Sequence, residues 1–149
     1  MRQIPSPPPH SINAIFVDES MLMNDRNSTI IYHFKFNPLY ILAVLNSRIT
    51  TFWSVNTFDK FQQKTFPRFT NKELVTFPIP DTSQSEPENI AKKAQTLLDL
   101  NKELQATSAN TDKHNSLKRE IGKLDYEIDE TVYKLYGFSN EEIKTIEEQ

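Results

Sequence analysis

Few residues of the chain are placed for catalysis. Its three histidines (His10, His33 and His114) fall in different predicted elements, and none has a carboxylate or second histidine at metal-ligand spacing. No serine lies in a nucleophile elbow, and the sequence contains no cysteine. With two glycines in 149 residues, a glycine-rich phosphate-binding loop is also excluded. We therefore expect no enzyme activity, no metal site and no cofactor.

A basic segment, residues 48–72, offers binding chemistry instead. The chain has a net charge of −3, yet this segment carries five bases against one acidic residue. Lys and Arg can neutralise phosphates, while Asn, Gln and Arg can make paired hydrogen bonds to base edges. The candidate DNA contacts are Arg48, Asn56, Lys60, Gln62, Gln63, Lys64, Arg68 and Lys72. On composition alone, however, a solvated basic loop is the simpler interpretation.

The elements that would position this segment begin with two predicted strands. Residues 11–18 and 29–36 are rich in β-branched and aromatic side chains with partial alternation, which favours neighbouring strands. Asn37 followed by Pro38 predicts the start of a helix over residues 38–54. Asn46 lies on the apolar stripe of that helix, and we interpret it as an amide that ties down nearby backbone.

Residues 55–69 show no helical period, and the following residues predict a short turn of helix. Thr70 and Glu73 have the spacing of a capping box, and Pro78 must end the turn that they start. Residues 77–80, Phe-Pro-Ile-Pro, should then lie extended on the core.

The last part of the chain predicts long helices. Ser85 and Glu88 suggest a second capping box, and apolar residues recur at helical spacing over 90–104 and 117–135. The short turn at 106–112 predicts an antiparallel hairpin, which Gly137 should end. Ser139 and Glu142 predict the cap of a terminal helix over 140–148.

Three motifs in order resemble one protein family. Residues 40–49, with Leu45-Asn46-Ser47, residues 66–80, with Phe-Pro-Arg and Phe-Pro-Ile-Pro, and residues 128–139, Ile-Asp-Glu-Thr-Val-Tyr-Lys-Leu-Tyr-Gly-Phe-Ser, resemble the TaqI-like C-terminal specificity domain. That domain ends many type IIG restriction–modification enzymes and is related to the specificity subunits of type I systems. The similarity spans roughly residues 12–148. Its recurrent motifs are scaffold residues, so they transfer no base-reading positions.

The resemblance implies a non-catalytic domain that recognises a double-stranded DNA sequence and positions an adenine methyltransferase or endonuclease part, which this chain lacks. We expect an α+β fold: a linker or disordered terminus (1–10), an α+β target recognition domain (11–84) and a helical hairpin spacer with a terminal helix (85–149).

The alternative is a protein–protein interaction module that acts through the acidic hairpin, because residues 86–149 hold nine basic and fourteen acidic residues. A homo-oligomer formed through the hairpin is compatible with either function. No apolar run approaches the roughly 20 residues that span a bilayer, and no signal peptide is visible, so we expect a cytoplasmic protein without membrane contact.

Overall fold

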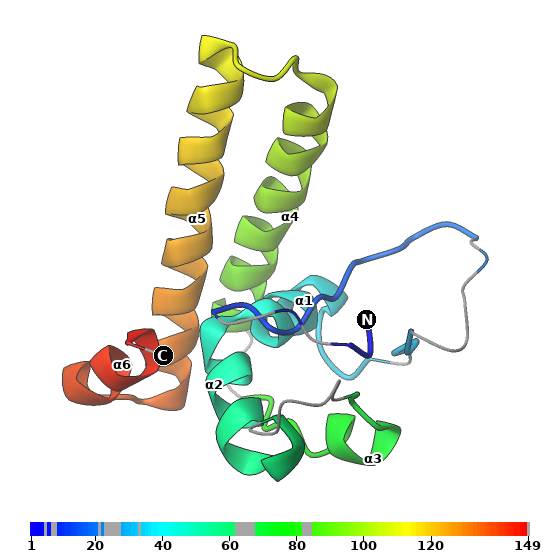
Figure 1. Cartoon of the computed structure of the whole chain (residues 1–149), viewed down its shortest axis with the longest axis vertical. Coiled ribbons are helices and arrows are strands. Elements are labelled where there is room, and N and C mark those ends of the chain that lie inside the picture. Colours follow the sequence, from blue (N-terminus) through cyan, green and yellow to red (C-terminus); the bar gives the residue numbers. More distant parts are fainter. Residues whose placement is uncertain are drawn as a thin grey trace.

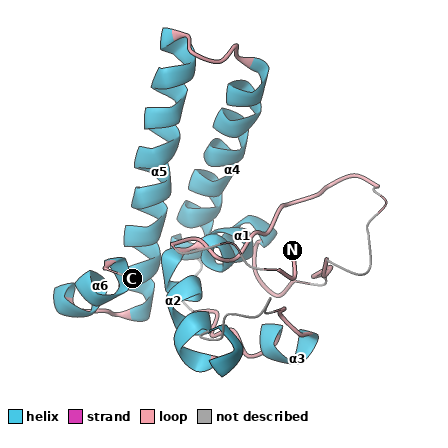
Figure 2. Cartoon of the chain, in the orientation of Figure 1, coloured by secondary structure: helices cyan, strands magenta, loops and turns pink. Residues whose placement is uncertain are grey.

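The computed structural model describes residues 1–4, 6, 9–20, 22, 28–32, 34–61, 68–81 and 85–148, with the backbone alone for Lys60. These residues are 62% helix and 2% strand. Figure 2 shows the described chain as helices joined by loops. The predicted α+β class with a small sheet is therefore wrong, because the described residues form no sheet.

The two predicted strands are loops wherever the structure describes them. The β pairing found among the described residues is one isolated antiparallel bridge, between Arg2 and Ser28. The first residues of the chain lie between the two segments: the Arg2 N–H donates to the Asn13 carbonyl at 2.9 Å, and the Thr29 N–H to the Met1 carbonyl at 2.8 Å. Within the described ranges, these alternating residues thus have no partner strand. Local alternation does not supply the neighbouring strand on which β structure depends.

Two helices replace the single helix predicted over residues 38–54. They are α1 (Pro38–Asn46) and α2 (Arg48–Thr57). Ser47 separates them with extended backbone, and its hydroxyl donates to the Val44 carbonyl at 2.7 Å. Serine competes in this way for backbone hydrogen bonds, which explains the break. Helix α2 also runs into the segment that we predicted to be irregular.

The predicted helix starts at Asn37 and Thr70 are confirmed. The Asn37 side-chain oxygen accepts the Leu39 N–H at 3.0 Å. After a 3-10 turn, η1 (Asp59–Phe61), the short helix α3 (Asn71–Leu74) begins with the capping box of Thr70 and Glu73.

Residues 77–80 form a loop, and their predicted contact with the core is confirmed at Phe77. The Phe77 side chain is buried, and the hydroxyl groups of two tyrosines hold the backbone of the next residues. The Tyr40 hydroxyl donates to the Pro80 carbonyl at 2.9 Å, and the Tyr136 hydroxyl donates to the Pro78 carbonyl.

A long antiparallel hairpin rises from the rest of the molecule (Figure 1). It consists of α4 (Ser85–Ala106) and α5 (Asp112–Tyr136), and α6 (Asn140–Glu147) turns back beside the base of α5. Gly137 ends α5 with a left-handed φ of 73°, and a capping box at Ser139 starts α6, both as predicted. Ser85 is the first residue of α4, so the predicted cap at Ser85 is displaced: the position before α4 lies outside the described residues.

Helix α1 contributes to two hydrophobic clusters. Val44 belongs to a cluster with Ile90 of α4 and Val132 of α5, so the hairpin and α1 share a core. Leu45, the next residue, packs in a second cluster with Phe69 and buried residues of the N-terminal segment. One face of α1 therefore packs on the hairpin, and another packs on the N-terminal segment and on the loop that contains Phe69.

Candidate nucleic-acid interface

The eight predicted DNA contacts fall into two groups. Gln62, Gln63 and Lys64 lie outside the described residues, as does the side chain of Lys60. The structure places the other four, which are Arg48, Asn56, Arg68 and Lys72.

Arg48 and Asn56 lie near opposite ends of α2. A rise of about 1.5 Å per residue separates them by roughly 12 Å along the helix axis. The Asn56 side chain is exposed, and its amide donates to the Phe52 carbonyl at 2.8 Å. Arg68 and Lys72 are exposed near the start of α3, and Phe69, which lies between them in the sequence, is buried. The aromatic residue therefore anchors the loop, as predicted, while the two bases lie at its surface.

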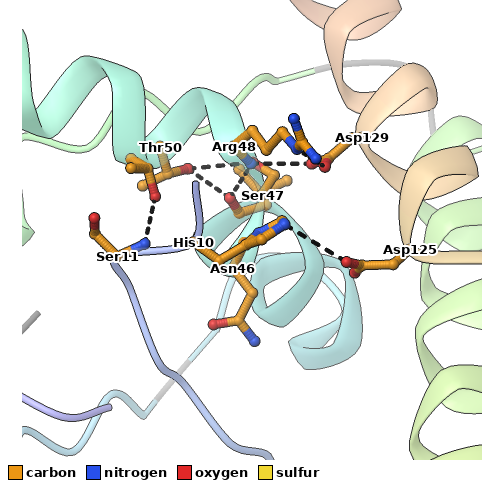
Figure 3. Close-up of polar contacts among 10 residues, drawn as sticks. His10, Ser11, Asn46, Ser47, Arg48, Thr50, Asp125 and Asp129 are labelled. Atoms are coloured by element: carbon orange, nitrogen blue, oxygen red, sulfur yellow. Dashed lines mark hydrogen bonds and ion pairs between the residues drawn. The ribbon is translucent and has the colours of Figure 1, made fainter. Parts of the chain in front are cut away.

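Arg48 faces the hairpin, because its side chain contacts a carboxylate of α5. Its Nε lies 3.5 Å from Asp129 Oδ2, and its backbone N–H donates to Asp129 Oδ1 at 3.0 Å (Figure 3). The Arg48 side chain is 30% exposed and that of Asp129 is 4% exposed. This base thus has a partner within the protein, at the junction between α2 and the hairpin.

Burial makes Asp129 harder to ionise. It raises the pKa of this carboxyl from its ordinary value near 3.8 to about 6, against the opposing effects of the Arg48 N–H and of His10. Asp125, one turn earlier on α5, raises the pKa further through its own negative charge. The junction between α2 and α5 therefore contains a carboxylate whose charge changes near neutral pH.

Asn46 fastens the N-terminal segment to the end of α1. Its Oδ1 accepts the Ala14 N–H at 2.8 Å, and its Nδ2 donates to the Ala14 carbonyl at 3.1 Å. The half-buried amide thus pairs with both polar groups of one residue, as a neighbouring strand would. This confirms that Asn46 ties down nearby backbone.

His10 and Ser11 complete the junction from the N-terminal side. His10 Nδ1 donates to the Asn46 carbonyl at 2.9 Å, and Nε2 lies 3.6 Å from Asp125 Oδ2. The Ser11 N–H donates to the Thr51 hydroxyl of α2 at 2.8 Å. Figure 3 shows the side chains of three separate chain segments meeting at the break between α1 and α2.

Sequence reasoning did not assign the partners His10, Asp125 and Asp129. Asp125 and Asp129 are four residues apart beside the apolar seam of α5, and Asp129 lies in the family-like motif at 128–139. An acidic pair at one turn's spacing next to a buried seam is a signal that could have indicated a buried polar contact. Its partner on α2 could not be read from local spacing, because 81 residues separate them.

An apolar groove of about 720 Å3 lies between the N-terminal loops and α1. Its lining includes Ile15, Phe16 and Ile30, each of which is more than a third exposed. Most exposed large hydrophobic residues of the described chain lie in these loops; Val75 follows α3, and α4 and α5 together contribute one, Tyr126. The seam of the hairpin is thus mostly covered by contacts within the molecule.

Two further properties concern the described residues alone. No three histidine or acidic side chains among them come together in a way that could hold a metal ion. None of their helices combines the length and the apolar character needed to cross a membrane.

Comparison with known proteins identifies a family. The sequence model of the TaqI-like C-terminal specificity domain matches residues 4–79, which is just over half of the chain. The chain therefore belongs to this family. No curated protein and no solved structure matches it. Membership points to a part in DNA sequence recognition within restriction–modification systems.

Proposed function

We propose that this member of the TaqI-like C-terminal specificity domain family recognises a double-stranded DNA sequence and positions a methyltransferase or endonuclease part on it. The chain itself is non-catalytic in this proposal. The observation that carries it is the family match over residues 4–79, which contains the whole basic segment.

The geometry supports surface contact by the second half of the basic segment. Arg68 and Lys72 are exposed, and the capped turn of α3 and the buried Phe69 hold the backbone that carries them. A fixed backbone lowers the conformational entropy that a side chain loses when it binds. Lys60, Gln62, Gln63 and Lys64 precede this turn and remain proposed contacts.

The proposal assigns separate roles to the two units expected from the sequence. Residues 11–84 form the target recognition unit, and residues 85–149 form the spacer that faces the methyltransferase or endonuclease part. The alternative, an interaction module that acts through the acidic hairpin, is less well supported. Stable protein interfaces have an apolar core, and the exposed large hydrophobic residues described on the hairpin are limited to Tyr126.

Selection from a randomised duplex library, followed by binding over a salt series, tests the proposal. A DNA reader should enrich one sequence, and its log K should fall with log[salt] by about 0.9 for each neutralised phosphate. The double change Lys64→Ala and Arg68→Ala should reduce that slope by about 2 if both bases contact phosphates.

The matched control removes two bases that lie elsewhere. Lys118 and Arg119 are exposed on α5, so the double change Lys118→Ala and Arg119→Ala removes the same charge and should leave the slope unchanged. Equal loss in both variants would show a general charge effect and contradict the assigned contacts. An absence of duplex binding by the wild-type chain at low salt would contradict its role as a DNA reader.

A further inference from the structure

Helix α2 receives the cap of its first turn from another part of the chain. The residue before it, Ser47, caps no backbone N–H of the helix: its hydroxyl donates to the Val44 carbonyl and lies 3.4 Å from the Thr50 hydroxyl. The carboxylate of Asp129 accepts the Arg48 N–H instead. An acidic side chain at a helix start satisfies a free N–H group and interacts favourably with the helix dipole. The start of α2 is thus held by the hairpin.

We propose that Asp129 is a positioning residue for DNA recognition, whose negative charge fixes the start of α2, and the basic segment that α2 opens, against the hairpin. The proposal rests on the proposed function, because the placement of the basic segment matters for binding only if that segment contacts DNA. Asp129 itself is not expected to touch DNA, since its side chain is 4% exposed.

The charged groups around Asp129 come from every element packed there. The N-terminal segment contributes His10, α2 contributes Arg48, and α5 contributes Asp125 and Tyr133. Glu147 of α6 faces Tyr133, whose pKa is raised first by burial and then by the charge of Asp129. Burial and Asp125 oppose the ionised form of Asp129, while Arg48 and His10 favour it.

Ionisation of Asp129 therefore has two opposite effects: it lowers the stability of the fold and it forms the ion pair with Arg48. The folded pKa of Asp129, about 6, is above its ordinary value near 3.8, so folding favours the protonated form. The stability that protonation contributes is present below about pH 4 and is lost as the pH rises through about 6. The ion pair with Arg48 forms over the same rise in pH. Above pH 6 the ionised carboxylate of Asp129 pairs with the Arg48 guanidinium, while the fold loses some stability because a buried charge is costly.

The test uses Trp53 of α2, the one tryptophan in the sequence, as a probe of the position of that helix. Its fluorescence is followed from pH 4.5 to 8 without DNA, in the wild-type chain and in Asp129→Asn. The wild type should show a transition near pH 6, and Asp129→Asn should lack it. The asparagine keeps an oxygen that can accept the Arg48 N–H, so the fold should be retained.

Asp125→Asn is the matched control, with the same substitution one turn away on the same helix. Its transition should remain and move slightly to lower pH, because Asp125 raises the pKa of Asp129. A wild-type chain without a transition, or a transition that persists in Asp129→Asn, would overturn the proposal.

A second variant covers the case in which Asp129→Asn does not fold. Arg48→Gln leaves the backbone N–H in place but removes the cation, so the transition should move to higher pH, because the charge of Arg48 lowers the pKa of Asp129. An unshifted transition in Arg48→Gln would equally overturn the role of the pair.

Binding to the enriched duplex at pH 5 and pH 8 separates this proposal from the proposed function. The wild type should change affinity between the two values by several-fold more than Asp129→Asn, while both keep the same salt slope, because no phosphate contact is removed. An equal change in both proteins would contradict the positioning role. If neither protein binds DNA, the proposed function fails, and the fluorescence titration still decides whether the charge of Asp129 positions α2.

Discussion

At the scale of single residues, Asn46 shows how one side chain can replace a missing strand. Its amide pairs with both polar groups of Ala14, while its own carbonyl accepts a hydrogen bond from His10. The apolar stripe of its helix predicted this role, because a polar residue on a buried face usually finds a partner. The apolar stripe did not predict that the partner would be Ala14, or that Ala14 would lie in a loop.

We expect Asn46→Ala to lower the free energy of unfolding by about 1–3 kcal/mol, because it leaves two half-buried groups of the Ala14 backbone without a partner. Urea denaturation measures this difference. Asn56→Ala, which removes an exposed amide from α2, should change the same quantity by less than about 0.5 kcal/mol. Similar losses in the two variants would mean that the pairing with Ala14 contributes little.

At the scale of elements, the two glycines of the chain differ in backbone conformation, although both have open space around them. Gly137 follows α5 with φ 73°, a conformation that side chains with a Cβ adopt at a cost, whereas Gly122 lies inside α5 with no atom within 4 Å of an added Cβ. Glycine in the middle of a helix is less stable than alanine because it loses more backbone entropy on folding.

Gly122→Ala should therefore raise the free energy of unfolding by about 0.5–1 kcal/mol, and Gly137→Ala should lower it by about 1–2 kcal/mol. Thermal unfolding would place the two melting temperatures on opposite sides of the wild-type value. Shifts of the same sign would contradict the assigned end of α5.

The helix ends also show which parts of the fold the sequence could predict. The caps at Asn37, Thr70 and Ser139 depend on residues two or three positions apart, and all three are confirmed. The break at Ser47 was missed, because the apolar stripe continues across it. The predicted strands failed for a different reason: alternation describes a segment, whereas a sheet requires a second segment that the local pattern does not specify.

The same distinction applies to the candidate interface. Local spacing predicted a loop held by Phe69 and exposing Arg68, and the structure shows this arrangement. It did not predict that Arg48 would contact Asp129, since that contact joins residues 81 positions apart.

At the scale of the whole molecule, the core crosses the proposed boundary between the two units. Val44 of α1 packs in one cluster with Ile90 and Val132 of the hairpin. Units that share a buried core are expected to unfold together, even where they differ in function.

Urea unfolding followed by Trp53 fluorescence and by far-ultraviolet circular dichroism should therefore give coincident transitions. The first signal reports α2, and the second is dominated by the long helices of the hairpin. Two separated midpoints would show that the hairpin unfolds independently of the recognition unit.

The shared core also has a consequence for synthesis on the ribosome. Residues 1–84 are synthesised before α4 and α5, so at that point Val44 lacks its partners and α2 lacks the carboxylate that caps it. At about 5–20 residues per second, the remaining 65 residues of the sequence require roughly 3–13 s. During that interval the apolar face of α1 lacks the residues of the hairpin that cover it in the folded molecule. The recognition unit, although made first, therefore completes its core only when the hairpin has been made.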